Sequence, residues 1–255
     1  EKTGWIVDKN SPISLADTIE LVLNKSNDEL YSVRKNAINH IKENFCLEKF
    51  GLRTVDYLES VGWLSDRTWL AHGIHFNKEE IQKLGQAGVV ICNCQTSNMM
   101  LASGICHSLE LEDAGSTIGL GVDGSASNDG SNMIAELRQS MYLQRLRYGA
   151  SKITHQKAYN WATKGSATLL GRSDIGEIAV GKQADLALFK LDEMRFSGSH
   201  DSLAALLLCG AQKADRVMIA GNWKVVDGRI VGQDASELTS RHSNAAKLLR
   251  QLSSV

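Results

Sequence analysis

The middle of the chain alternates between short apolar runs and amphipathic stretches, and this alternation limits the possible folds most. We expect strands at WLAH (69–72), VVICNC (89–94) and TIGLGVD (117–123), and helices at 77–88, 108–115, 132–149 and 153–171. Asn77, with Glu80 three residues later, has the spacing of a helix-capping box. Strands that alternate with helices predict parallel βαβ units and therefore an α/β fold.

Two of the expected strands end in a polar residue, His72 and Asp123. In a parallel βα array the carboxyl ends of the strands face one shared mouth, where ligands bind. A histidine and a carboxylate there suit a metal such as zinc, or acid–base chemistry around a water. A buried structural histidine and a helix-capping aspartate explain the same spacing, and the pattern alone leaves these interpretations open.

The ends of the chain follow other patterns. After Gly171, short β runs at 177–192 and 216–232 are broken by the turn pairs Gly181-Lys182, Gly221-Asn222 and Asp227-Gly228. These pairs are typical of hairpins and predict a small β-domain, followed by a terminal helix. The first 45 residues favour a strand, a Ser-Pro turn and two helices.

The charge and composition of the chain limit the kinds of molecule it is expected to bind. The net charge is −1 and the pI is about 6.7, which gives no support for binding to nucleic acid or a membrane surface. No run of about 18 apolar residues suggests a membrane span, and no secretory leader is evident. With five loosely spaced cysteines, the chain is expected to be cytoplasmic with reduced thiols.

Four segments together resemble the amidohydrolase superfamily: AHGIHF (71–76), TSNMMLASGI (96–105), GLGVDGSASND (119–129) and GEIAVGKQADLALF (176–189). The similarity covers about residues 46 to 235. It is greatest to the aminohydrolases and deaminases of ring substrates, the group of 8-oxoguanine deaminase and the hydroxy-triazine aminohydrolases. The resemblance implies an α/β chain with part of a (β/α)8 barrel (strands six to eight and their helices) plus part of a small β-domain.

The same resemblance implies a domain order and a site. The expected domains are 1–45, 46–175 (the barrel part), 176–235 (the β-domain) and a terminal helix at 236–255. Asp123 would be the eighth-strand metal ligand and would take a proton from the attacking water. His72 would be the sixth-strand histidine that orients this water and polarises the ring carbon, and it is also a candidate metal ligand. The metal would be zinc or another divalent ion. The expected substrate-binding residues are Asn98, Ser125 and Asn128, and the substrate would be a purine- or triazine-like ring that loses an amino group.

Several features depart from the family pattern. The seventh-strand segment usually reads His-Cys-Pro, but here it is Asn93-Cys94-Gln95, and Met100 replaces a basic residue. The chain contains no His-x-His pair, which the family places on its first strand. A full barrel needs roughly 250 residues, whereas about 125 lie between Phe45 and Gly171. The alternative to a deaminase is therefore an inactive half-barrel, whose open sheet edges predict a homo-oligomer.

Three smaller features leave alternatives open. Residues 3–45 resemble the C-terminal tail of a glycosyltransferase, with a join near Asn44, so the chain resembles a chimera. His40 and Glu43 in HIKE could replace the family's fifth-strand ligand and proton shuttle, although the surrounding pattern favours an exposed helix. Cys92 and Cys94 lie on one face of a strand and are expected to be buried apolar residues rather than metal ligands.

Overall fold

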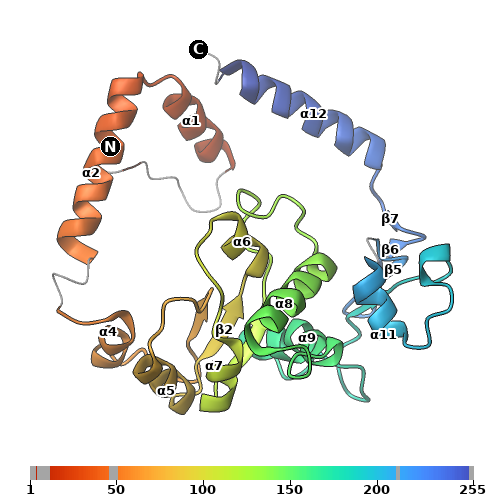
Figure 1. Ribbon diagram of the computed structural model, residues 1–255. Coiled ribbons are helices and arrows are strands. Elements are labelled where there is room, and N and C mark those ends of the chain that lie inside the picture. Colours follow the sequence, from red (N-terminus) through yellow and green to blue (C-terminus); the bar gives the residue numbers. More distant parts are fainter. Residues whose placement is uncertain (1–3, 5–11, 46–50, 211–212, 253–255) are drawn as a thin grey trace. The chain divides into compact units, whose positions relative to one another are not determined.

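The computed structural model describes residue 4 and residues 12–45, 51–210 and 213–252 (Figure 1). Two compact units emerge: residues 1–57 together with 234–255, and residues 58–233. The domain boundaries predicted from the sequence remain predictions. Within the described ranges, no helix has the length and apolar character that crossing a membrane requires.

The first unit is helical in its described part. It contains α1 (Pro12–Leu23), α2 (Asn27–Phe45) and α12 (Ala235–Leu252), while α4 (Thr54–Ser60) spans the boundary between the units. Helix α2 begins with a capping box, in which the Ser26 backbone N–H donates to Glu29 Oε2 and the Glu29 N–H donates to Ser26 Oγ. His40 is exposed and lies on this helix, so the helical interpretation of HIKE is confirmed.

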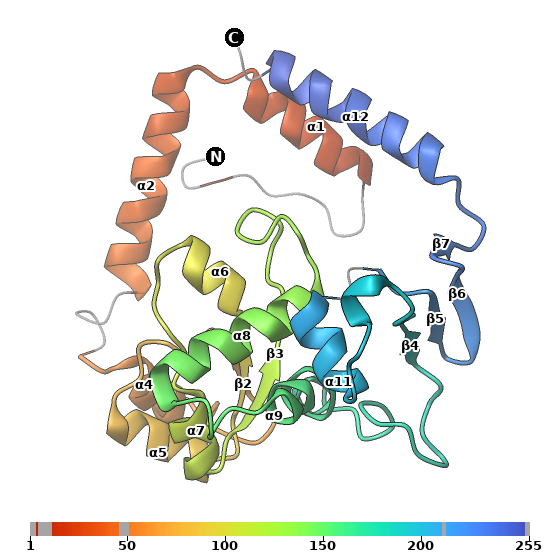
Figure 2. The same cartoon turned by 45° about the vertical axis from the view of Figure 1, so that its right-hand side comes forward.

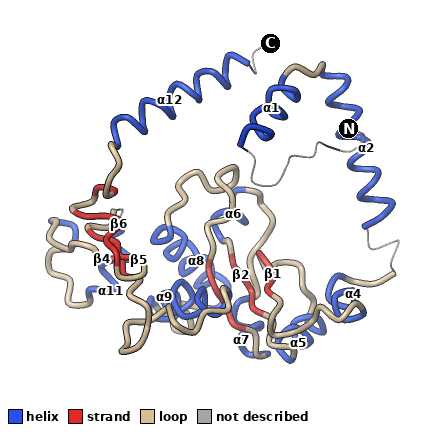
Figure 3. The backbone as a smooth tube through the Cα atoms, turned by 180° about the vertical axis from the view of Figure 1, so that it is seen from behind, coloured by secondary structure: helices blue, strands red, loops and turns tan. Residues whose placement is uncertain are grey.

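The second unit contains a three-stranded parallel sheet in the order β1-β2-β3 (Figure 3). Its strands are β1 (Trp69–Ala71), β2 (Val90–Asn93) and β3 (Thr117–Leu120), with Leu70 opposite Ile91 and Ile91 opposite Ile118. Every residue of β2 is buried, as expected for a central parallel strand. Among the described strands of this sheet, β1 and β3 form the edges, and Trp69 on β1 is 53% exposed.

Helices α5 (Lys78–Gln86) and α7 (Ser108–Ala114) pack against each other between successive strands (Figure 1). The expected capping box begins α5: the Glu80 N–H donates to Asn77 Oδ1, and the Asn77 N–H donates to Glu80 Oε2. A helix that the sequence reasoning did not anticipate, α6 (Gln95–Met100), follows β2 directly and packs on α8 (Met133–Tyr148).

A continuous helical stretch from 155 to 169 covers β3. It consists of α9 (His155–Asn160), a π-helical turn η1 (Trp161–Gly165) and α10 (Ser166–Leu169), and it begins at the expected cap Thr154, whose Oγ1 accepts from the Lys157 N–H. Two glycines let the helix approach the strand closely. A Cβ on Gly165 would lie 1.9 Å from the Ile118 carbonyl oxygen, and one on Gly119 would lie 3.1 Å from the Gly165 oxygen.

A four-stranded antiparallel sheet in the order β4-β5-β6-β7 forms the small β part (Figure 2). Its strands are β4 (Leu186–Leu188), β5 (Arg216–Ile219), β6 (Asn222–Val226) and β7 (Arg229–Ile230); η2 (Met194–Phe196), α11 (Ser202–Ala205) and the π-helical η3 (Leu206–Gly210) lie between β4 and β5. The turn at Asp227-Gly228 is confirmed, and both residues have positive φ. The strand expected to begin at 177 is wrong in its first part, because Ile178 and Val180 are exposed and lie outside any strand.

Candidate active site

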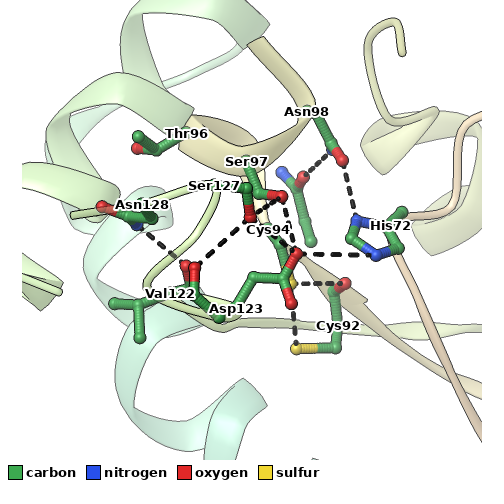
Figure 4. A network of polar contacts seen from close by, with 12 residues as sticks. His72, Cys92, Cys94, Thr96, Ser97, Asn98, Val122, Asp123, Ser127 and Asn128 are labelled. Carbon is green, nitrogen blue, oxygen red and sulfur yellow. Dashed lines mark hydrogen bonds and ion pairs between the residues drawn. The ribbon is translucent and has the colours of Figure 1, made fainter. Parts of the chain in front are cut away.

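His72 and Asp123 lie just beyond the carboxyl ends of β1 and β3, and their side chains face each other (Figure 4). His72 Nε2 is 3.9 Å from Asp123 Oδ2, which is too far for a hydrogen bond. The His72 N–H donates to the Cys92 carbonyl, which extends the β1–β2 pairing by one residue. Parallel strands that end at one edge therefore bring together two residues 51 positions apart.

Both residues have a left-handed backbone, with φ of 70° at His72 and 62° at Asp123. Residues other than glycine seldom adopt this conformation, although Asp and His tolerate it better than most. Such conformations cost about 1 to 3 kcal/mol and concentrate at functional sites. Here the turn that follows each strand aims the two side chains into the same space.

Hydroxyl and backbone donors surround the Asp123 carboxylate. Ser97 Oγ donates to Oδ2 at 2.6 Å, and Ser127 Oγ contacts the same oxygen at 3.4 Å. The Ser97 hydrogen bond, followed by the Gly124 backbone N–H, holds the pKa of Asp123 below its ordinary value. The carboxylate is therefore ionised at neutral pH and can accept a proton.

On its other side, the His72 ring contacts α6. His72 Nδ1 is 2.8 Å from Asn98 Oδ1, and Asn98 is 1% exposed. The sequence reasoning grouped Asn98 with the substrate-binding residues. In the structure its amide is directed at His72 and at Asn93, because its Nδ2 donates to Asn93 Oδ1.

The loop of small residues after β3 is held by hydrogen bonds that involve the buried Glu136. Asn128 Nδ2 donates to the Val122 carbonyl at 2.9 Å and to Glu136 Oε2 at 3.2 Å, and Glu136 Oε1 accepts from the Thr96 N–H. Asn128 is thus engaged within the loop, whereas Ser125 is exposed on it. Their predicted contact with substrate remains a prediction.

The donors do not form a complete metal centre. Zinc sites in enzymes use about three protein ligands and an open position. In the part of the chain that the structure describes, no three His, Cys, Asp or Glu side chains gather closely enough to hold a metal ion. His72 and Asp123 therefore supply two suitable donors and lack a third.

Cys92 on β2 and Cys94 directly after it do not add to this pair. Cys92 and Cys94 are 6% and 4% exposed, and their sulfurs are 3.9 Å apart. This burial agrees with the apolar role expected for them.

Four residues of the site and of the polar network behind it are absent from the sequence expectations: Ser97, Ser127, Glu136 and Gln144, whose Nε2 donates to Gln95 Oε1. One signal for two of them was available: Glu136, Ser140 and Gln144 recur every four residues on the buried face of α8. Polar residues on an otherwise buried helix face need partners inside the protein, so their spacing could have indicated an internal polar network.

Comparison with known proteins places this geometry in a family. The amidohydrolase family model matches residues 15–224, and the match begins inside the segment that resembles a glycosyltransferase tail. The 8-oxoguanine deaminase of Pseudomonas aeruginosa (strain PAO1) is 70% identical over 208 residues, which are 82% of this chain and 46% of that protein. An isoxanthopterin deaminase from an unknown prokaryotic organism is 32% identical over 219 residues, covering 80% of this chain and 45% of its own.

Solved structures of amidohydrolase-type enzymes also resemble this chain. Atrazine chlorohydrolase from Arthrobacter aurescens TC1, complexed with zinc, aligns with a TM-score of 0.75 and 31% identity over 80% of this chain and 46% of that one. The chain thus spans about half the length of the relatives it matches.

Proposed function

Because the chain belongs to the amidohydrolase family, we propose that it carries one side of the active centre of a hydrolytic deaminase. The pairing of His72 with Asp123 at the ends of β1 and β3 is the observation that supports this most. In this proposal β1, β2 and β3 are barrel strands six, seven and eight. The substrate is a purine- or triazine-like ring with an exocyclic amino group.

The reaction class requires two proton movements. A water adds to the ring carbon that bears the amino group and gives up a proton, the C–N bond breaks, and the amino group gains a proton and leaves as ammonia. Asp123 is ionised and can take the proton from the water. His72 faces the same space and holds the position of the water and the ring.

Members of this family work with a divalent metal, which activates the attacking water. The described residues of this chain do not by themselves fit such an ion, because they offer two donors. We therefore propose that the centre is complete only when donors from outside the described residues join the pair. The alternative, a chain that has lost catalysis, predicts that no added donors restore it.

The loop after Asp123 supports a flat substrate. A Cβ placed on Gly124 would meet nothing within 4 Å, and residues 124–126 are exposed. The carboxylate is thus approached over small residues rather than over large side chains. The 70% identity to an 8-oxoguanine deaminase favours an oxidised purine as the ring.

A hybrid enzyme tests the proposal. The segment of this chain that matches the Pseudomonas aeruginosa enzyme replaces the corresponding segment there, and ammonia release from 8-oxoguanine is measured. We expect activity in the hybrid and a loss of about 10² to 10⁴-fold with Asp123→Asn, the range of a positioned acid–base group. A folded hybrid without activity above its Asp123→Asn variant would contradict the proposal and favour the inactive alternative.

A further inference from the structure

Behind His72 lies a row of buried carboxamides that the proposed reaction does not use. Its members are Asn98, Asn93, Gln95 and Gln144, each at most 1% exposed. Two of them, Asn93 and Gln95, stand where the sequence departs from the family pattern. The row runs from the site to the carbonyl oxygen of Cys106.

The contacts form an unbroken series. Gln144 Nε2 lies 3.2 Å from the Cys106 carbonyl oxygen and 3.4 Å from Gln95 Oε1. Asn93 Nδ2 lies 3.5 Å from the same Gln95 oxygen, and Asn98 Nδ2 lies 3.4 Å from Asn93 Oδ1. The last contact joins Asn98 Oδ1 to His72 Nδ1 at 2.8 Å.

The direction of this series follows from its fixed end. A backbone carbonyl can only accept, so Gln144 must present its NH₂ group to Cys106. That same NH₂ group faces Gln95, which must therefore present its oxygen.

The constraint continues along the row. Because Gln95 presents its oxygen, Asn93 donates to it, and the Asn93 oxygen then accepts from Asn98. Asn98 is left with its oxygen toward His72.

Reversing the amides would be unfavourable. Among the described residues, Gln95 Nε2 and Gln144 Oε1 are the two atoms of the row without a hydrogen-bond partner. Exchanging N and O in both glutamines would set the Gln144 oxygen against the Cys106 carbonyl oxygen and the Gln95 NH₂ against the Asn93 NH₂. Each like-to-like contact between buried polar groups costs about 1 to 3 kcal/mol, so the original direction is favoured.

We propose that this row of amides, the amide relay, fixes the tautomer of His72. Asn98, held by Asn93, Gln95 and Gln144, accepts a hydrogen bond from Nδ1–H of His72, which leaves Nε2 as a bare acceptor facing Asp123. Asn98 is thus a positioning residue. With Nε2 unprotonated, neutral His72 cannot donate to the carboxylate 3.9 Å away. His72 Nε2 and the Asp123 carboxylate are then two acceptors that face the same space. They fit a ligand group that can donate more than one hydrogen bond, such as a water or an amino group.

The tautomer follows from the hydrogen bonds alone, whereas its use in catalysis rests on the proposed deaminase function. Nitrogen NMR of the histidine side chains in this chain separates the two questions. In its neutral form, His72 is expected to show a protonated Nδ1 and a bare Nε2. A His72→Gln variant assigns the signals.

Matched variants test the relay. Gln144→Met removes the donor to Cys106 at similar volume and should shift His72 toward the Nε2–H form that imidazole favours in water. Gln139→Met, on the exposed face of the same helix, should leave the spectrum unchanged. If Gln144→Met does not fold, two variants at position 98 test the relay instead. Asn98→Asp retains an acceptor for His72 and should keep the Nδ1–H tautomer, whereas Asn98→Leu removes the acceptor and should lose that tautomer.

We expect at least a tenfold excess of the Nδ1–H form in the unaltered chain, which corresponds to about 1.4 kcal/mol. Neutral His72 with its proton on Nε2 would overturn the inference, as would a folded Gln144→Met or Asn98→Leu variant with the unaltered spectrum. An inactive hybrid with the expected His72 spectrum would refute the deaminase proposal and leave the tautomer assignment intact.

Discussion

Gly165 offers the sharpest test of how the helix over β3 holds the site. Gly165→Ala adds a methyl group whose carbon would lie 1.9 Å from the Ile118 carbonyl oxygen, about 1.5 Å closer than an ordinary contact. The obstacle is backbone, so it cannot rotate away as a side chain could. The helix must move off the strand that leads to Asp123.

The expected loss of stability combines three effects. Overpacking of this kind costs about 1 to 3 kcal/mol. Moving the helix also weakens the bonds of the Ser166 hydroxyl to the Leu120 N–H and carbonyl, both 3.1 Å long, at about 1 kcal/mol. Alanine is a better helix former than glycine by up to about 1 kcal/mol. The last two effects nearly cancel, so the net destabilisation is about 1 to 3 kcal/mol, against the sign that helix propensity alone predicts.

Thermal unfolding measures this difference. For a unit of this size, 1 kcal/mol shifts Tm by about 2 to 4 °C, so we expect a decrease of about 2 to 12 °C. Gly130→Ala is the matched control, because its nearest neighbour is Asn128 Oδ1 at 3.9 Å and its φ is not left-handed. The control should stay within about 0.5 kcal/mol of the unaltered chain. A Gly165→Ala variant as stable as the control would refute the close-contact reasoning.

Three further predictions concern the site and the sheet edges. Ser97→Ala should raise the pKa of Asp123 toward its ordinary value, which a titration followed by the NMR signal of the Asp123 carboxyl carbon measures. The lowered pKa stabilises the fold above the ordinary carboxyl pKa, and this stabilisation is lost as the pH falls through the folded-state pKa. An unchanged titration midpoint of Asp123 would contradict the assignment. Asp123→Gly should be more stable than Asp123→Ala by about 1 kcal/mol, because φ there is left-handed; equal urea midpoints would remove the strain argument. The edges of β1 and β3 predict self-association in size-exclusion chromatography, and a folded monomer counts against it.

Local signals in the sequence predicted much of the second unit. The signals that begin two helices lie within four residues of the helix start: Asn77 with Glu80, and Thr154. Both caps are confirmed. The three parallel strands were also predicted, because their apolar runs do not depend on distant residues. Strand ends then predicted that His72 and Asp123 lie together.

Features that depend on distant residues were not predicted. Helix α6 has no side-chain cap, and its buried residues Ser97 and Asn98 are polar, so its pattern indicates no apolar face. Its position is explained by α8, since Glu136 binds the Thr96 N–H from 40 residues away. Ile178 and Val180 are apolar yet exposed, and composition alone does not show whether a partner strand is present.

Zinc content tests the central claim most directly. The purified chain, the hybrid enzyme and their Asp123→Ala variants would be freed of loose metal and analysed for zinc per protein. If His72 and Asp123 are two ligands of an incomplete set, the chain alone should retain far less than one zinc per protein. The hybrid should retain about one zinc, and its Asp123→Ala variant should lose it. One zinc firmly held by the chain alone and removed by Asp123→Ala would contradict the account, as would a folded hybrid that binds none.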